Sequence, residues 1–145
     1  MVSVLRKEYP EIAEIIAARI KDTLPEEKLY DLSNINLIVT SFKNERGVKV
    51  EKWTNCKGKA NITYERELLI AVLLLYYDPE KIMQLTKRQT VNGLLKCTAN
   101  LIGTSTEILS MSIPAVIVAF KAYESFREEV YRLYELISIE NKFFE

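Results

Sequence analysis

An unbroken run of apolar residues, from Leu68 to Tyr77, constrains the fold of this chain more than any other feature. The run is about half as long as the ~20 residues that a membrane-spanning helix needs. Glu65 and Glu67 precede it, where the start of a helix favours acidic side chains, and its apolar residues recur at helical spacing. We therefore expect a helix from Thr63, its capping residue, to about residue 77, at the centre of a hydrophobic core.

The rest of the composition fits one ordered domain. Of the 145 residues, 48% are apolar and 28% are charged, an ordinary ratio for a single soluble domain. Four glycines and four prolines are too few for a collagen-like or low-complexity chain. We expect one domain over residues 1–145, with an N-terminal part at 1–60 and a helical core at 63–139.

The sequence lacks the residues on which several kinds of chemistry depend. The chain has no histidine, which removes the commonest general base, nucleophile partner and zinc ligand. Its four glycines lie too far apart to form a phosphate-binding loop. The two cysteines, Cys56 and Cys97, form no Cys-x-x-Cys motif, and no leader-like segment is recognisable. The sequence therefore predicts a cytoplasmic protein that is not an enzyme, with no cofactor, no metal site and no membrane partner.

The first half of the chain predicts helices, with one alternative left open. Apolar spacing and early prolines predict a helix from about 10 to 23 and a short helix at 25–31. Residues 32–46 also fit a helical stripe, which would end at Gly47. The residues at 37–53 are rich in strand formers, so a small β-hairpin there is the alternative.

The second half predicts more helices, and the whole chain therefore predicts an all-α bundle of five to seven. A helix at 88–102 is expected to end at Gly103, after which Thr104 begins a capping box and a short helix at 105–111. A second cap followed by a proline predicts the start of a last helix, which runs from 113 to about 139. The residues expected to share one core are Leu69, Val72, Leu73, Leu94, Leu101, Ile108, Ile117 and Phe120.

Twenty basic and twenty acidic residues cancel, yet the charges are unevenly placed. Residues 43–66 carry seven basic and three acidic side chains, and residues 81–106 carry four basic and no acidic ones. Such segments are often simply solvated surface, but they also supply the local positive charge that phosphate binding needs. The basic candidates for phosphate contacts are Lys49, Lys52, Lys57, Lys59, Lys87, Arg88 and Lys96.

The second basic segment coincides with a helix-turn-helix pattern at 88–112. That motif needs a first helix, a tight turn that usually contains glycine, and a second helix that presents short polar side chains to DNA. Gly103 would supply the turn, although a capped helix after a glycine also turns corners in proteins that bind no DNA. The polar candidates for DNA contacts are Gln89, Thr104, Ser105, Thr106 and Ser110.

The same region carries a family resemblance. The order Gly93-Leu-Leu-Lys96, Leu101-Ile-Gly-Thr-Ser105 and Ile108 to Ser110, followed by a helix ending Lys121-Ala-Tyr-Glu-Ser-Phe-Arg-Glu-Glu-Val130, resembles small helix-turn-helix proteins related to the DNA-binding domain of bacterial replication initiators. The resemblance covers about 85–138 and implies that the residues from 104 to 112 read DNA. The Asp-His-Thr-type signature of those proteins is absent here.

Two functions therefore compete. The first is a small DNA-binding protein, such as a regulator from a mobile element or phage, that places residues 104–112 in the major groove of duplex DNA and the loop at 43–59 on phosphates. This function predicts one continuous positive surface. The second is a helical protein–protein interaction module that binds no nucleic acid, whose acidic last helix pairs with a protein partner or forms a homodimer.

Overall fold

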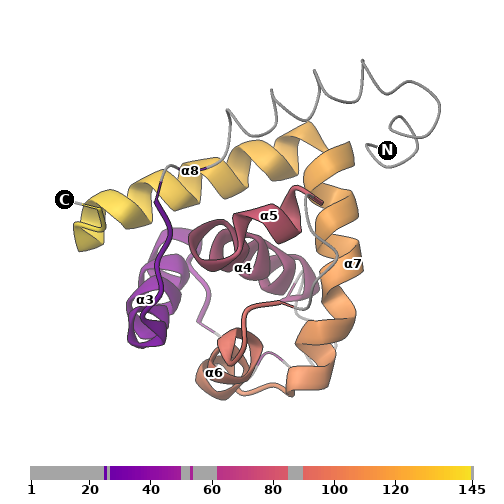
Figure 1. Cartoon of the computed structure of the whole chain (residues 1–145), viewed down its shortest axis with the longest axis horizontal. Coiled ribbons are helices and arrows are strands. Elements are labelled where there is room, and N and C mark those ends of the chain that lie inside the picture. The colour runs from indigo at the N-terminus through magenta and orange to yellow at the C-terminus, as the bar shows by residue number, and fades with distance from the viewer. Residues whose placement is uncertain (1–24, 26, 50–52, 54–61, 85–89, 145) are drawn as a thin grey trace.

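Helices make up all of the regular structure in the part of the chain described by this computed structural model, which is 25, 27–49, 53, 62–84 and 90–144 (Figure 1). The prediction of an all-α fold is confirmed, with six α-helices and one short 3₁₀ helix in these residues. The predicted helix at 10–23 lies outside them. The elements are η1 (Leu32–Asn34), α3 (Ile35–Arg46), α4 (Ile62–Tyr77), α5 (Pro79–Ile82), α6 (Leu94–Ile102), α7 (Thr106–Ala122) and α8 (Glu124–Asn141).

Helix α4 lies at the centre of the molecule, with α3, α5, α7 and α8 packed around it (Figure 1). Every residue from Leu68 to Tyr77 is buried. A helix that is apolar on all sides must be covered on all sides, and the surrounding helices do this. The predicted central helix is therefore confirmed, although it begins at Ile62 and not after a cap at Thr63.

Two buried tyrosines end α4 and tie it to its neighbours. The hydroxyl of Tyr76 donates to the carbonyl of Tyr134, 2.7 Å away, and lies 2.6 Å from the hydroxyl of Ser138. The hydroxyl of Tyr77 donates to the carbonyl of Asp31 at 2.7 Å. Burial raises the pKa of both phenols above the usual value. Both side chains thus bury their rings while their hydroxyls keep hydrogen-bond partners.

The N-terminal part resolves the choice between helix and hairpin. Residues 32–46 form η1 and α3, as the helical stripe predicts, and Gly47 ends α3 with a φ of 66°, which suits glycine. The alternative hairpin at 37–53 is wrong, because its residues 37–46 are helical. The helix has the advantage that Ile35, Ile38 and Phe42 all reach the core from one face.

The predicted short helix at 25–31 is also wrong, since none of its described residues is helical. The reason lies at the end of α4, where the last carbonyls of a helix have no partner within the helix. The backbone N–H of Leu29 donates to the carbonyl of Tyr76 at 2.8 Å. This segment therefore gives a hydrogen bond to the end of α4 and does not form a helix of its own.

The core contains most of the predicted residues. Leu69, Val72, Leu73, Leu94 and Phe120 are buried, as expected. Ile117 is only partly buried against the core, and Ile108 is also only partly covered. Leu101 is 37% exposed, so its assignment to the core is wrong. Its neighbour Ile102 is buried in its place.

The last two helices divide at a different residue from the one predicted. Helix α7 runs through Pro114 without a break and ends before Tyr123, whose backbone is extended. A proline removes one helical hydrogen bond, here to the carbonyl of Ser110, and both residues are exposed. At the actual break, the side chain of Arg127 donates to the carbonyl of Phe120 at 3.0 Å. The predicted start at 113 is therefore wrong.

Candidate functional site

The predicted corner between two helices exists at α6 and α7. The chain bends by 111° between them across the three residues 103–105. Gly103 ends α6 with a φ of 65°. Ser105 caps α7, because its hydroxyl accepts from the N–H of Ile108 at 3.2 Å, so the cap is one residue later than the predicted Thr104. Helix α6 begins at Leu94, and the described residues 90–93 of the predicted helix at 88–102 are not helical.

A buried tryptophan anchors the end of α6. The backbone N–H of Trp53 donates to the carbonyl of Ile102 at 2.9 Å, and the carbonyl of Trp53 accepts from Arg66 at 2.8 Å. The indole ring is fully buried and lies 6.0 Å from the ring of Phe42. The corner is therefore fixed to the core from its inner side.

Few of the candidate hydroxyls at this corner are free to contact a ligand. The hydroxyl of Thr104 is buried without a hydrogen-bond partner, and that of Ser105 is the α7 cap. The hydroxyl of Ser112, at the end of the segment 104–112 that the resemblance implies reads DNA, donates to the carbonyl of Ile108 at 2.8 Å. Thr106 and Ser110 are exposed. The structure thus leaves two of the four predicted polar contacts that it describes open to solvent.

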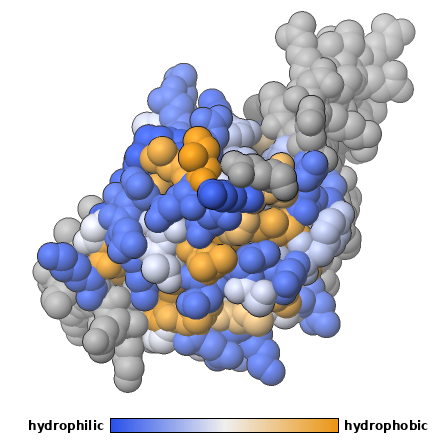
Figure 2. Space-filling view, turned by 90° about the vertical axis from the view of Figure 1, so that its left-hand side faces the viewer, coloured by the Kyte–Doolittle hydropathy of each residue, from blue (hydrophilic) through white to orange (hydrophobic). Residues whose placement is uncertain are grey.

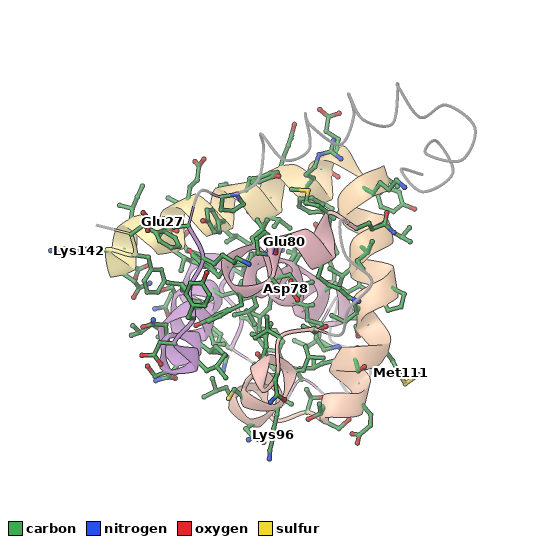
Figure 3. The ribbon with its side chains drawn as sticks, viewed as in Figure 1. Glu27, Asp78, Glu80, Lys96, Met111 and Lys142 are labelled. Carbon is green, nitrogen blue, oxygen red and sulfur yellow. The ribbon has the colours of Figure 1, made fainter. Side chains whose placement is uncertain are left out.

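Most of the candidate basic residues lie outside the described part of the chain. Lys49 and Lys96 are exposed, and Figure 3 shows Lys96 pointing away from α6. Neither lies on α7, whose charged residues are Glu107 and Lys121. The predicted contacts that fall outside the described residues are Lys52, Lys57, Lys59, Lys87, Arg88 and Gln89.

Helix α7 instead presents an exposed apolar surface, the feature that sequence reasoning missed. Met111 is 80% exposed and Val118 is 58% exposed, and Figure 3 shows Met111 pointing away from the rest of the molecule. Exposed residues recur every three or four positions, while Leu109, Val116 and Phe120 are buried on the opposite side. We call this surface the outer face of α7, and its residues are Glu107, Ser110, Met111, Pro114, Ala115, Val118, Lys121 and Ala122.

The sequence contained a signal for this face. Spacing places Met111, Ala115 and Val118 on one stripe only if the helix continues through Pro114. A helix that begins near that proline, as predicted above, divides the stripe between two elements. Within α7, Glu107 and Lys121 stand near the two ends, and the residues between them are uncharged.

Another face of the molecule has a different character. Figure 2 views the molecule from the left-hand side of Figure 1, where α3 and the C-terminal end of α8 lie, and shows apolar patches separated by hydrophilic side chains. The exposed apolar residues of these two elements include Leu37 and Ile139. Their exposed neighbours one helical turn away include polar side chains, Thr40 beside Leu37 and Glu135 beside Ile139, whereas Pro114 and Ala115 lie between Met111 and Val118. Scattered apolar residues of this kind are normal on a protein surface.

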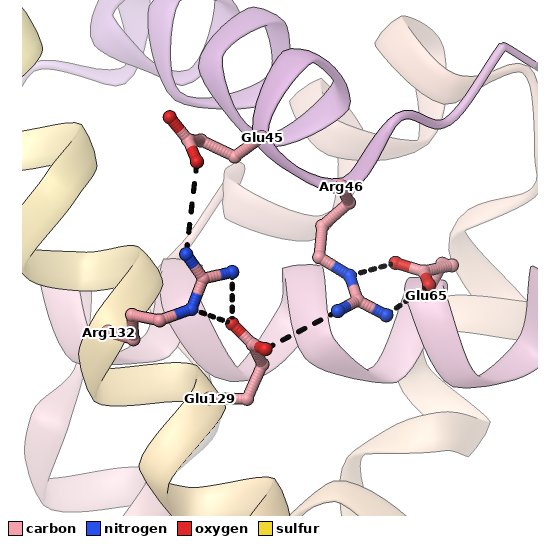
Figure 4. A network of polar contacts seen from close by, with 5 residues as sticks. All are labelled: Glu45, Arg46, Glu65, Glu129 and Arg132. Carbon is pink, nitrogen blue, oxygen red and sulfur yellow. Dashed lines mark hydrogen bonds and ion pairs between the residues drawn. The ribbon is translucent and has the colours of Figure 1, made fainter.

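A network of ion pairs holds α3, α4 and α8 together (Figure 4). The guanidinium of Arg46 binds both carboxylate oxygens of Glu65, at 2.8 and 2.5 Å, and lies 3.4 Å from Glu129. Arg132 pairs with the same Glu129 at 2.5 Å and lies 3.8 Å from Glu45. The hydrogen bond to Glu65 raises the pKa of Arg46, and partial burial opposes this effect. Arg46 of α3 thus pairs with carboxylates on α4 and α8, and Arg132 pairs with Glu129 on its own helix and with Glu45 on α3.

The described residues contain neither a metal-binding cluster nor a single membrane-spanning helix. They contain no group of three or more aspartate, glutamate, cysteine or histidine side chains that could hold a metal ion. None of their helices is by itself both long and apolar enough to cross a membrane, and α6 with α7 passes that test only as a pair bent by 111°. No protein-family model, no curated protein and no solved structure matches this chain.

Proposed function

We propose that this protein is a helical protein–protein interaction module whose contact surface is the outer face of α7. The observation that carries this proposal is the exposure of Met111 and Val118 on one stripe of a helix whose other side is buried. An apolar surface that is rimmed by polar residues is typical of a binding site. The partner that suits it is a protein surface with apolar side chains, because such a surface removes the stripe from water.

The charges of α7 also favour a protein partner over DNA. Phosphate binding depends on lysine and arginine, and the outer face has one lysine, near its C-terminal end. Glu107 is exposed in the first turn, where a recognition helix meets the negative DNA backbone. The hydroxyl of Thr104 is buried, so it has no access to a base edge. Each of these features makes α7 less suited to bind DNA as a recognition helix.

Duplex DNA is the second candidate, because one observation favours it. The bend of 111° across a three-residue turn falls within the range of about 90–120° that helix-turn-helix units have. Thr106 and Ser110 are exposed on the second helix of this unit, as contacts to DNA would require. Both candidates therefore use α7, and they differ in the kind of side chain that makes the contact.

Site-specific photo-crosslinking tests the protein-partner proposal directly. Benzoylphenylalanine is placed at position 111, at 118 or, as the control, at the exposed position 100 on α6. We expect crosslinked polypeptides, identified by mass spectrometry, from 111 and 118 in an extract of the source organism. Crosslinks that are absent from 111 and 118, or equally strong from 100, would overturn the proposal.

An anisotropy titration against a labelled random duplex tests the second candidate. A protein that neutralises about five phosphates has a log–log salt slope near −4 to −5. We expect no such binding at about 50 or 200 mM salt. If binding with this slope occurs and Thr106→Glu with Ser110→Glu removes it, α7 is a DNA-binding helix and the interaction-module proposal is wrong.

A further inference from the structure

We propose that the partner of the outer face of α7 is a second copy of this chain, bound with the two α7 helices antiparallel. This inference rests on the proposed function, which it narrows to one occupant and one orientation. A pair related by a two-fold axis uses the same surface on both subunits, so the surface must be complementary to itself. The outer face meets this condition in both shape and charge.

The shape of the outer face is symmetric about its middle. In an antiparallel pair that crosses between Pro114 and Ala115, Met111 of each copy faces Val118 of the other. The two largest apolar side chains of the face, which are 80% and 58% exposed, would then cover each other. The small alanine at the crossing point allows the two backbones to approach closely, as small residues do at helix contacts.

The charges of the face are complementary only in this orientation. The same pairing places Lys121 of one copy within one residue of the position opposite Glu107 of the other, and symmetry makes this contact twice. Glu107 has no ion-pair partner among the described residues, and the ammonium of Lys121 lies 3.4 Å from the neutral amide oxygen of Gln84. Lys121 likewise has no carboxylate partner in the described part of the chain, so neither charge is neutralised there. A parallel pair would place glutamate against glutamate and lysine against lysine, which repel each other.

The length of the face sets the expected strength of the dimer. From Glu107 to Ala122 the stripe is about 22 Å long, because a helix rises 1.5 Å per residue. One helix from each copy forms a small interface, below the usual size of a permanent dimer. We therefore expect a reversible dimer with a dissociation constant on the order of micromolar concentrations or weaker.

Sedimentation equilibrium of charge variants tests both the partner and the orientation. Glu107→Lys makes two lysines face each other in the antiparallel pair, and Lys121→Glu makes two glutamates face each other. We expect each single variant to raise the dissociation constant about tenfold at low salt and less at high salt. The double variant Glu107→Lys with Lys121→Glu restores opposite charges, so its dissociation constant returns close to that of the parent. An equimolar mixture of the two single variants also forms the dimer.

The double variant also distinguishes the loss of paired charges from a folding defect. Glu107 lies in the first turn of α7 and Lys121 in the last, where each interacts favourably with the helix dipole. Reversing both charges therefore destabilises the helix more than reversing one. Weakened dimers caused by poor folding would become weaker still in the double variant, whereas dimers that depend on the paired charges recover. Circular dichroism of each variant confirms its helix content.

The possible results separate this inference from the proposed function. A chain that stays monomeric up to millimolar concentration overturns the inference, as does a dimer that none of the charge variants weakens. Loss in the single variants without recovery in the double variant overturns the antiparallel orientation. If the chain is monomeric while positions 111 and 118 still crosslink to another identified protein, the proposed function stands and only the second copy is wrong.

Discussion

Helices α4 and α7 are both long and largely apolar, yet one is enclosed and the other is open. From Leu68 to Tyr77 every residue of α4 is buried, and the neighbouring helices account for its apolar composition. On α7 the buried residues, such as Val116 and Phe120, occupy only one side of the helix. The exposed Met111 and Val118 are not needed to fill the core, so packing within the chain does not explain them. Apolar residues thus fill the core in α4, whereas some of those in α7 form an exposed surface.

The largest effect is expected from truncating a buried side chain of α4. Leu73 is buried among the helices that surround α4. Leu73→Ala leaves a cavity and removes apolar contacts, and we expect it to lower the free energy of unfolding by about 2–5 kcal/mol. Denaturant titration followed by circular dichroism measures the change. A loss below about 0.5 kcal/mol, the size of an ordinary surface substitution, would mean that α4 is not the centre of the core.

The second prediction concerns the ion pairs at the start of α4. Arg46→Ala leaves the half-buried carboxylates of Glu65 and Glu129 without their shared cation, and we expect a loss of about 1–3 kcal/mol in unfolding free energy. The matched control is Arg132→Ala, because Arg132 is more exposed and pairs with the same Glu129. An exposed ion pair contributes about 0–1 kcal/mol. Equal losses from both variants would show that partial burial of the network is irrelevant.

A third prediction uses the tyrosines that end α4. Burial raises the pKa of Tyr76 and of Tyr77, so the folded chain keeps both phenols neutral, whereas in the unfolded chain they ionise near pH 10. The unfolded state therefore releases protons more readily, and the free energy of unfolding falls as the pH rises above about 10. Urea titrations at about pH 8 and 10.5 measure this fall. We expect a smaller fall in the variant Tyr76→Phe with Tyr77→Phe, and an unchanged fall would contradict the assignment.

The smallest expected effect is on α7 itself. Met111→Ser and Val118→Ser remove exposed apolar side chains, so we expect the unfolding free energy of the monomer to change by no more than about 0.5 kcal/mol. Thermal unfolding at low protein concentration, where a dimer does not contribute, is the appropriate measurement. A loss as large as that of Leu73→Ala would show that these side chains stabilise the folded monomer.

The sequence predicted the enclosed helix better than the open one. An apolar run such as Leu68–Tyr77 can only be buried, so its place follows from composition alone. The helix at 32–46 and the turn at Gly103 also followed from local patterns. The non-helical segment around Leu29 could not be predicted in this way, because its hydrogen bond to Tyr76 joins residues 47 positions apart.

The candidate site was harder to predict for a similar reason. Pro114 suits the first turn of a helix, and only the tertiary packing shows that α7 continues through it. The hydroxyls of Thr104 and Ser105 look alike in sequence, yet one is buried and the other caps α7. Their environments depend on the direction in which α7 leaves the corner, which the local sequence does not specify.

The central claim is that two copies of this chain associate through the outer face of α7, and the methionine methyl groups test it most directly. The chain has three methionines, of which Met111 is on this face and Met83 is partly buried against the core. In spectra of the chain with ¹³C-labelled methionine methyl groups, we expect the Met111 resonance to shift and broaden as protein concentration rises. The Met83 resonance should change much less. A Met111 resonance that stays constant from micromolar to millimolar concentration would contradict self-association through this face.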